Sequence, residues 1–430
     1  MSATNDIARE RRTRIGLETT FGTTPSGSFP EAMTAILAIG SDLIVDGAAE
    51  ELLPVADERV RRDDNPLPVH GIRIASKVGN LACYLKATKA ANQLTAAGAV
   101  GSLTPRVLLK HAMGAEAAAV GTTISGTAST TTVLNVTSAA TFKKGTFIAV
   151  QVGSEMEWAK VLDIDTGASP DTITIAPALS AAPATDGTIV RNLYNYAPAE
   201  SHANSLTVQQ AIVGDSTAQW TFNGCYGDLA LSLETAKLPK LTMALTATNY
   251  TGPSAQGLST AQATDEMGAS FAWTPSVYVA PNVTNASTVD RAVRLPCESM
   301  GFERANTWEL VRDPGATQTV ASVINTGGRP EACKATIRTR FDHDWHAGFA
   351  ADTSYQIVYA QRIGTGTAAS FWIVEVPDAR LLMEPKPVKV GERLYFDLAF
   401  HGLQDPTVAL DGETGTDLDF VLATSRIAFG

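Results

Sequence analysis

The sequence predicts a mainly β protein: a β-sandwich or barrel with a short flanking helix and a small β insert domain. Three observations support this prediction. Residues 205–250 contain runs in which Leu alternates strictly with small or polar residues. Residues 120–193 contain short β-prone runs separated by turn signals, and residues 291–430 form a second β-prone region. Alternation with a period of two places one set of side chains on a buried face and the other toward solvent or a partner.

Residues 205–250 are expected to form an antiparallel meander with one apolar and one Thr-rich face. Its alternating apolar positions are Leu229, Leu231, Leu233, Leu241, Met243, Leu245 and Ala247. Gly224 and Gly227 permit unusual backbone conformations, and they predict a sharp chain reversal ahead of the first Leu run. Nothing in this meander indicates catalytic chemistry.

The N-terminal part combines irregular segments with one clear helix. Residues 1–30 are polar and punctuated by Gly and Pro, which predicts an extended arm that is not packed. Residues 46–68 are charged and irregular, which is typical of a long loop or hairpin tip. Thr104 as a cap, Pro105 at the first helical position and Gly114 at the end predict a short helix. The Ala content of residues 80–97 allows a second one.

Residues 120–193 are expected to be a compact β insert on the outer surface, because the meander resumes directly after them and surface loops accept insertions at low cost. The expected strands are Thr131–Val136, Phe147–Val152, Met156–Ile164 and Thr172–Ile175. The first β domain is then discontinuous and comprises residues 31–119 and 194–250.

The second part of the chain suggests a repeat of the first. Residues 251–290 are rich in Gly, Ser, Thr, Ala and Pro and are expected to be a linker or long loop. In residues 291–430 the strand order of the meander recurs, which suggests an internal duplication of the first β domain. The matched segments are Tyr355–Arg362 with Leu206–Val213, Phe371–Val376 with Gln219–Gly224, and Leu394–Phe400 with Leu241–Ala247.

The composition argues against several classes of protein. The 430 residues carry a formal net charge of −11, whereas a protein that grips nucleic acid needs a concentrated Lys/Arg surface. The four cysteines are far apart and form no C-x-x-C pair, so free thiols in a reducing compartment are expected. The longest apolar stretch, residues 33–39, is too short to cross a bilayer. A soluble protein made in a cytoplasm is therefore expected.

The motifs that resemble chemical sites favour structural interpretations, so no catalytic, cofactor-binding or metal-binding residue and no cofactor is assigned. His343 and His346 have metal-like spacing but lack a nearby Cys or distant His partner, which favours a solvated loop. Asp163 and Asp165 resemble the start of a calcium loop, but Thr174 stands where the required Glu would be, which favours a tight turn. Residues 364–366 lack the helix that a phosphate site requires and predict a hairpin turn.

Three parts of the chain together resemble the major tail tube proteins of long-tailed, siphovirus-like bacteriophages. The segment ETTFGTTP at Glu18–Pro25 is similar to the E-x-x-x-G-T opening common in that family. The glycines at 224–227 precede two alternating strands joined through Lys237–Pro239. The segments KKGTFIAVQVGSE and IAPALSAAP look like the small β domains that decorate such tubes.

The resemblance implies a non-enzymatic structural subunit that polymerises as stacked rings into a hollow conduit, with an acidic lumen for DNA passage into the host. Its implied partner is itself, in hexameric rings or in trimeric ones if the domain is duplicated. It also implies contacts with tape measure, distal tail and terminator proteins, and transient passage of genomic DNA without specific binding or membrane binding. The implied location is the tail of the virion, after assembly in the host bacterial cytoplasm.

Two alternatives come from other classes of protein. A β-sandwich adhesin or carbohydrate-binding module would show an aromatic platform on an exposed face and would be a monomer or dimer. A hydrolase with a site assembled from scattered residues, such as Asp342 and His346, would be indicated by a bound metal.

Overall fold

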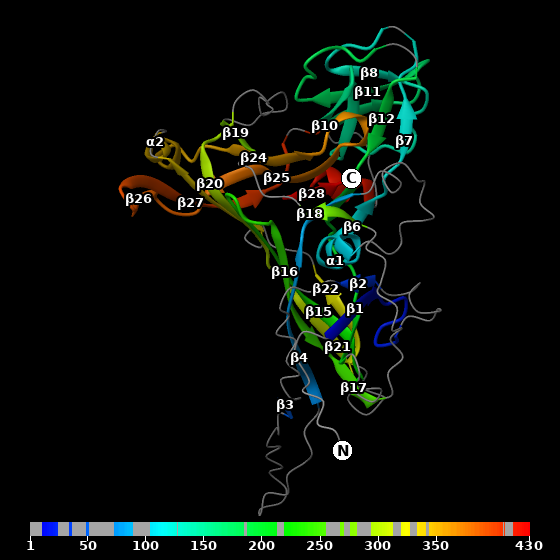
Figure 1. Ribbon diagram of the computed structural model, residues 1–430, viewed down its shortest axis with the longest axis vertical. Coiled ribbons are helices and arrows are strands. Elements are labelled where there is room, and N and C mark those ends of the chain that lie inside the picture. Colours follow the sequence, from blue (N-terminus) through cyan, green and yellow to red (C-terminus); the bar gives the residue numbers. More distant parts are fainter. Residues whose placement is uncertain are drawn as a thin grey trace, which may run out of the picture.

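The structure is a computed structural model of the chain. It describes residues 11–24, 34–36, 49–50, 73–88, 104–126, 128–184, 187–212, 219–254, 267–270, 276–281, 294–312, 320–326, 333–340, 344–406, 408 and 416–430. These residues form a mainly β protein built from antiparallel sheets with few helices (Figure 1), which confirms the predicted fold class.

The elements before and inside the insert are β1 (Arg11–Leu17), β2 (Thr34–Ile36), β3 (Ala49–Glu50), β4 (Arg73–Tyr84), β5 (Lys86–Thr88), α1 (Thr104–Met113), β6 (Gly114–Ala117), β7 (Gly121–Thr123), β8 (Val133–Val136), β9 (Phe147–Val152), β10 (Glu155–Asp165), β11 (Asp171–Ala176) and β12 (Ile189–Asn192). The meander and its neighbours are β13 (Tyr194–Pro198), β14 (Leu206–Ile212), β15 (Gln219–Glu234), β16 (Lys240–Ala247), β17 (Asn249–Ser254) and β18 (Met267–Ser270). The rest of the chain forms β19 (Val277–Pro281), β20 (Cys297–Arg304), β21 (Trp308–Arg312), β22 (Val320–Asn325), β23 (Cys333–Arg340), α2 (Trp345–Ala350), β24 (Tyr355–Ile363), η4 (Gly366–Ala368), β25 (Ser370–Leu381), β26 (Lys386–Val390), β27 (Arg393–Leu403), α3 (Thr416–Val421) and β28 (Arg426–Phe429).

The predicted meander is present as β14, β15, β16 and β17, each antiparallel to its neighbour. Leu229, Leu231 and Leu233 on β15 are all buried, and the residues between them are more exposed. The alternating pattern therefore marks the buried face correctly, since successive side chains of a strand point to opposite faces.

The predicted reversal at Gly224–Gly227 is wrong, because β15 runs through both glycines as one strand of 16 residues. Gly224 has φ +60° and lies where the β14 pairing shifts register. A Cβ added at Gly227 would overlap the backbone of Ala244 on the neighbouring strand. These glycines allow a bulge and a close approach between strands, which are other uses of the same residue type.

The predicted helix is present as α1, which starts at Thr104 and ends before Gly114, with φ +90° at that glycine. Val107, Leu108 and Leu109 of α1 are buried in the main core. The second helix allowed for residues 80–97 is wrong for its first part, because residues 80–84 belong to β4 and residues 86–88 form β5. Residues 89–97 lie outside the described residues.

The predicted N-terminal arm is packed where the structure describes it. All seven residues of β1 pair with β14, so residues 11–17 are part of a sheet. After the strand, the Glu18 carboxylate accepts hydrogen bonds from the backbone N–H groups of Gly22 and Gly224 and from the hydroxyls of Ser205 and Thr207, at 2.6–2.8 Å. These contacts supply the order that a polar, Gly-rich segment lacks by itself. Residues 1–10 and 25–30 lie outside the described residues.

Two further segments expected to be irregular contain strands. Residues 251–290 were predicted as a linker, but they include the end of β17 together with β18 and β19, which pair with β5 and β24. Pairing with distant strands overrides the Gly- and Ser-rich composition here. In the predicted loop at residues 46–68, residues 49–50 form β3, and residues 51–68 lie outside the described part.

The insert forms a six-stranded sheet in the order β7-β12-β9-β10-β11-β8, at the top of Figure 1. All the strands predicted for it are present. Val136, Ile148 and Ile173 belong to a core cluster made only of insert residues. A second cluster joins Phe147 and Trp158 of the insert to β24 and β25, so the insert is packed against the second part of the chain.

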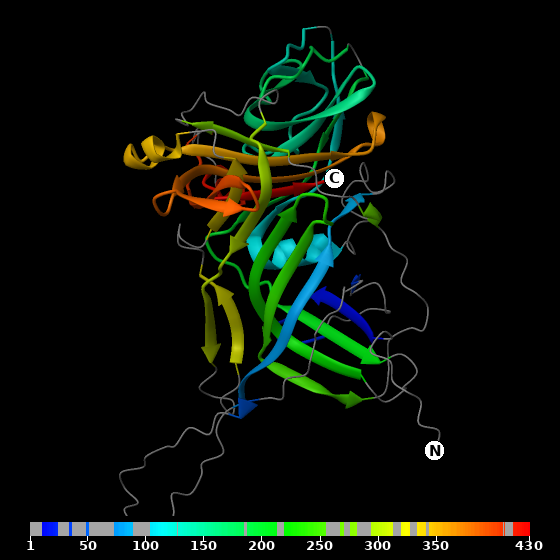
Figure 2. The same ribbon diagram turned by 60° about the vertical axis from the view of Figure 1, so that its left-hand side comes forward.

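In the two halves of the chain the strands pair in the same order. In the first half, β1, β14, β15 and β17 pair in that order, and β15 continues to β16, β4 and β3. In the second half, β19, β24, β25 and β28 pair in that order, and β25 continues to β27, β23 and β20. The helices α1 and α2 stand at the same place in the chain order. Figure 2 shows the blue and green strands of the first half below the orange and red strands of the second.

Candidate assembly surface

Eight strands pair in one series across both halves, in the order β3-β4-β16-β15-β20-β23-β27-β26, and we call this series the wall. The halves meet where β15 pairs with β20, from Leu229 opposite Arg304 to Glu234 opposite Ser299. The contact is an ordinary antiparallel ladder, in which the backbone supplies the pairing and side chains supply the fit.

One face of the wall is buried. Leu231, Phe302, Ala335 and Phe400 lie opposite one another on successive strands, and all four belong to the main core. The helix α1 contributes to the same core and appears in cyan behind the strands in Figure 2. From β16 to β27 the wall thus has one apolar face that packs into the main core.

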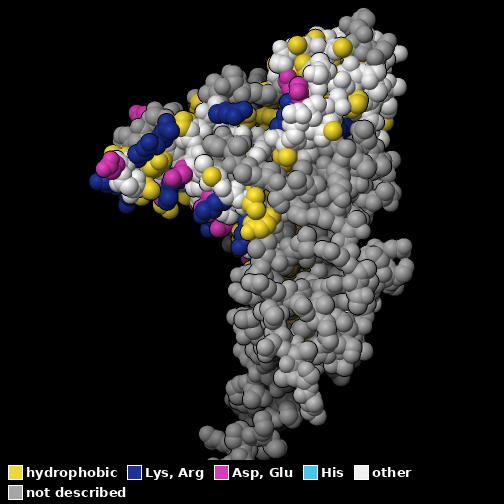
Figure 3. Space-filling model, viewed as in Figure 1, with side chains coloured by type: hydrophobic (Ala, Val, Ile, Leu, Met, Phe, Trp, Pro, Cys, Tyr) yellow, Lys and Arg dark blue, Asp and Glu magenta, His cyan; other side chains and the backbone are white. Residues whose placement is uncertain are grey.

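The opposite face of the wall carries charges of both signs. Its acidic residues are Asp228, Glu234, Glu303 and Asp397, and its basic residues are Lys240, Lys334, Arg338, Arg340, Lys386 and Arg393. Arg338 and Asp397 form a bidentate ion pair with bonds of 2.6 and 2.8 Å. Figure 3 shows basic and acidic side chains interspersed over the described part of the second half.

The two ends of the wall are strand edges. At one end β3 pairs with β4, and at the other β26 pairs with β27; neither strand has a second partner in the described part of the chain. Beside β26, the large apolar side chains Leu382, Met383, Val390 and Leu394 are exposed, Met383 to 59% and Leu394 to 51%. We call these four residues the β26 patch. An exposed strand edge favours contact with another molecule, and these apolar side chains flank it, with Val390 and Leu394 on opposite faces of the β26–β27 hairpin.

The junction between the halves is reinforced by the hairpin of β21 and β22. The Trp308 ring at the start of this hairpin stacks on His111 of α1 at 5.0 Å and meets His202 edge-on at 5.6 Å. His202 and Asn325 exchange backbone hydrogen bonds of 2.8 and 3.1 Å. Burial lowers the pKa of His111 to about 3 and that of His202 to about 4. Both imidazoles are therefore neutral near pH 7.

A buried ion cluster attaches the insert to the second half. Lys160 of β10 lies 2.9 Å from Glu375 of β25 and 2.5 Å from Asp405. Arg426 of β28 lies 2.7 Å from each of the same carboxylates. Two cations thus balance two anions where a lone charge would be strongly disfavoured. No local sequence pattern marks these residues, which are far apart in the chain.

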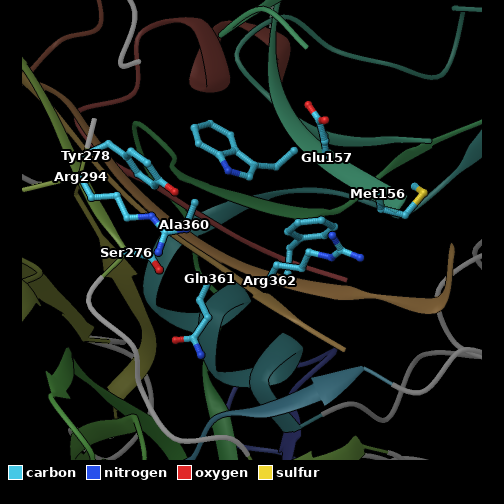
Figure 4. Close-up of a pocket in the computed structure, with 10 residues that line it drawn as sticks. Met156, Glu157, Ser276, Tyr278, Arg294, Ala360, Gln361 and Arg362 are labelled. Carbon is cyan, nitrogen blue, oxygen red and sulfur yellow. The ribbon is translucent and has the colours of Figure 1, made fainter. Parts of the chain in front are cut away.

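A cavity of about 320 Å³ lies between the insert and the strands β19 and β24. Trp158 and Tyr278 pack ring to ring at 5.9 Å beside it. Arg294, which precedes β20, and Arg362 of β24 also line the cavity (Figure 4). Both aromatic rings are buried, so they do not form the flat exposed platform expected of a carbohydrate-binding face.

The residues considered as chemical sites lie in structural settings. His346 is on α2, 3.7 Å from Glu384 and against the Phe396 ring, and residues 341–343 lie outside the described residues. Asp165 accepts hydrogen bonds from the N–H groups of Gly167 and Ala168, which is the predicted tight turn. Residues 364–366 lie in the connection between the paired strands β24 and β25, as predicted.

Within the described ranges, no group of three or more His, Cys, Asp and Glu side chains could hold a metal ion. Cys225, Cys297 and Cys333 are buried free thiols. None of the helices in the described part of the chain is long and apolar enough to span a membrane.

The fold and the wall together define a class of protein: a β-rich chain made of two edge-joined units of one topology, with a small β insert. Comparison with known protein families and with curated protein sequences finds no match for this chain.

Proposed function

We propose that this chain is a structural subunit of a bacteriophage tail tube, which polymerises as stacked rings into a hollow conduit for DNA passage into the host. The observation that carries the proposal is the wall, in which two units of one topology are already joined edge to edge through β15 and β20. A chain that makes this contact internally, and whose described part leaves an edge at each end of the series, is suited to repeat the contact between copies.

The internal repeat bears on the number of chains in a ring. If each half of the chain occupies one subunit position in the ring, three chains fill six positions, and a trimer has the shape of a six-fold ring. Closure removes every unpaired edge, as in a β-barrel. The apolar face of the wall is covered by α1 and the outer strands, so we propose that the charged face lines the lumen.

The charge of that face changes one detail of the expected mechanism. Acidic and basic residues alternate there, as in the pairs Arg338–Asp397 and Lys334–Glu303. We therefore propose a lumen of mixed charge in place of an acidic one, past which genomic DNA moves without specific binding. The backbone hydrogen bonds between strands would make the tube rigid. Because acidic residues lie among the basic ones, the lumen would not bind the phosphates of DNA tightly.

The proposed partners follow from this role. Other copies of the chain form the ring and the stack, and tape measure, distal tail and terminator proteins of the tail would contact the tube. The proposed location is the tail of the virion, after assembly in the host bacterial cytoplasm. The role assigns no catalytic residue and no cofactor.

Electron microscopy of the purified, concentrated protein tests the proposal. Rings or hollow filaments are expected, and analytical ultracentrifugation should show a multiple of three chains in a ring. Dispersed monomers or dimers at every concentration would contradict the proposed function.

A second candidate function is a β-sandwich adhesin or carbohydrate-binding module that takes its ligand in the cavity beside Trp158, since the buried Trp158 and Tyr278 rings form no exposed platform. Its lining combines aromatic rings with the polar side chains of Gln361 and Arg294, a combination that small polar ligands use. Titration with a panel of mono- and oligosaccharides, followed by tryptophan fluorescence, tests this candidate. A saturable change that is lost in Trp158→Phe would support it, and no change would exclude these sugars as ligands.

A further inference from the structure

The interface between the insert and the second half contains the cavity of about 320 Å³. Residues of β10 line it from the insert, and residues of β19, β24 and β25 line it from the second half. Around it, Phe147 and Trp158 of the insert pack with Tyr278 and Phe371 in one core cluster. Sites for small molecules typically have volumes of about 300–1,000 Å³. The cavity is therefore large enough for a ligand the size of a sugar ring.

The strand register places three polar side chains on one wall of the cavity. Ser276 and Tyr278 are two positions apart, so their side chains point to the same face of the strand. Val277 forms an antiparallel bridge with Leu295, which donates its N–H to the Val277 carbonyl at 2.8 Å. This bridge places Arg294 opposite Tyr278, and opposite residues of an antiparallel pair share a face. Figure 4 shows Tyr278, Arg294 and Ser276 on the same side of the cavity.

Arg294 supplies this wall with a positive charge that has no counterion. Its side chain is exposed, and no residue in the described part of the chain forms a hydrogen bond or ion pair with its guanidinium. The exposure of Arg294 also shows that solvent reaches this end of the cavity. A guanidinium offers a rigid fork of N–H donors, which matches the two oxygens of a carboxylate.

The two other charged residues described in the lining already have partners. Glu157 accepts hydrogen bonds from the hydroxyl and the N–H of Ser180, the latter at 3.0 Å. Arg362 forms an ion pair with Glu155, which also accepts the N–H of Gly366 at 2.9 Å. Figure 4 shows Arg362 on the other side of the cavity from Arg294, and the Glu157 carboxylate pointing away from both. The charge available to a ligand is therefore that of Arg294.

We propose that this cavity binds a sugar acid, a uronic acid whose carboxylate pairs with Arg294. The hydroxyls of Ser276 and Tyr278 would form hydrogen bonds with the hydroxyls of the sugar. Trp158 and Phe371 supply the apolar part of the lining, against which the C–H groups of the sugar ring pack. This inference rests on the second candidate function, whose ligand it narrows from sugars in general to anionic ones. It does not depend on the assembly of a tube.

A ligand in this position would contact the insert and the second half at the same time, since Trp158 lies on β10 and Tyr278 on β19. Binding should therefore hold the two parts together. A ligand that binds only the folded protein raises its thermal midpoint in proportion to the logarithm of ligand concentration above Kd. Hydrogen exchange should also become slower in β10 and β19 when the cavity is filled.

Isothermal titration calorimetry with D-glucuronate tests the inference. D-glucose is the matched probe, because it carries a CH2OH group in place of the carboxylate. Glucuronate is expected to bind at least about tenfold more tightly than glucose, since only glucuronate can form charge-assisted hydrogen bonds with Arg294. A disaccharide with a terminal glucuronate separates two sources of this ligand. Tighter binding of the disaccharide would assign the end of a polysaccharide, and equal binding would assign the free sugar acid.

Variants of the polar wall show whether the sugar occupies the proposed position. Arg294→Gln should abolish the preference for glucuronate over glucose, and Arg294→Lys should retain part of it. Tyr278→Phe keeps the ring against Trp158 and should weaken the binding of both sugars. Arg393→Gln is the control, because Arg393 is also exposed but lies on β27, away from the residues that line the cavity.

The possible results separate the inference from the second candidate function. A preference for glucuronate that is lost in Arg294→Gln and kept in Arg393→Gln supports the inference. Equal binding of both sugars, or a preference unchanged in Arg294→Gln, overturns it and leaves a site for neutral sugars standing. Acetate that binds as tightly as glucuronate overturns it as well, because the ring would then not be recognised. No binding of any sugar at millimolar concentration overturns both, whereas rings in the electron microscope would still support the tube.

Discussion

Lys160 of the insert and Glu375 of β25 form an ion pair of 2.9 Å in which both side chains are almost completely buried. The residues are 215 positions apart in the chain, and their contact fixes the insert to the second half. Asp405 and Arg426 complete the cluster, so each charge has a partner of opposite sign. A cluster of this kind constrains orientation, because a shifted insert would leave buried charges unpaired.

Replacing Lys160 by Met should therefore destabilise the protein strongly. One guanidinium would then face two buried carboxylates, and loss of one partner of a buried pair costs about 3–5 kcal/mol. Urea denaturation followed by circular dichroism measures the free energy of unfolding. The control is Lys237→Met, which removes an exposed ion pair with Glu234 and should cost at most about 1 kcal/mol. Equal costs for the two variants would contradict this account of the cluster.

The buried histidines predict a pH dependence of stability. Burial lowers the pKa of His111 to about 3 and that of His202 to about 4, whereas an exposed imidazole titrates near 6.5. In acid the unfolded chain binds these protons first. Their contribution to stability is therefore complete above pH 6.5 and is lost as the pH falls toward 4 and 3.

Denaturation midpoints measured between pH 8 and pH 4 test this dependence. His111→Phe keeps a ring against Trp308 but cannot titrate, so its midpoint should fall less steeply below pH 6.5. A slope unchanged from that of the parent protein would show that His111 does not contribute. His346→Phe is the control, because His346 is exposed on α2.

Glu18 should be required for order in the segment after β1. Its carboxylate accepts hydrogen bonds from two backbone N–H groups and two hydroxyls. Glu18→Ala leaves these donors without that acceptor, at a cost of about 1–3 kcal/mol for a buried donor. Hydrogen exchange should become faster in residues 18–24. Glu18→Gln keeps one acceptor oxygen and should show a smaller change, and fast exchange confined to distant strands would contradict the assignment.

The sequence predicts those parts of the fold that depend on local patterns. Alternation identified the strands of the meander and the insert, and Thr104, Pro105 and Gly114 identified α1 because capping acts over a few residues. Local reasoning failed where distant contacts decide. Gly227 looked like a turn residue from its neighbours in the sequence. Its actual role is to allow close approach of Ala244 on the next strand, which the sequence alone does not reveal.

Only the general nature of the candidate surface was predictable from the sequence. The repeated strand order suggested a duplicated unit, but it did not show that the two units pair through β15 and β20. The ion cluster around Glu375 joins residues from four separate segments, and no spacing in the sequence indicates it. The exposure of the β26 patch could not be predicted from the sequence either, since Met and Leu residues such as Met383 and Leu394 usually occupy core positions.

Removal of the insert should leave assembly intact if the insert decorates the outside of the tube. β6 and β13 pair directly, with Ala117 opposite Asn195, so a short linker can replace residues 121–192. The deletion also removes Lys160 and leaves an excess carboxylate, so it should be combined with Glu375→Gln. The shortened chain is expected to form rings at a concentration within about threefold of the parent protein, as judged by sedimentation and electron microscopy.

The control for this deletion separates folding from assembly. The shortened chain without Glu375→Gln should be less stable, because Glu375 and Asp405 then share the single cation Arg426. If the compensated chain is folded by circular dichroism but stays monomeric, the insert takes part in the contacts between copies. That result would place the insert within the assembly surface and would contradict an outward, decorative position.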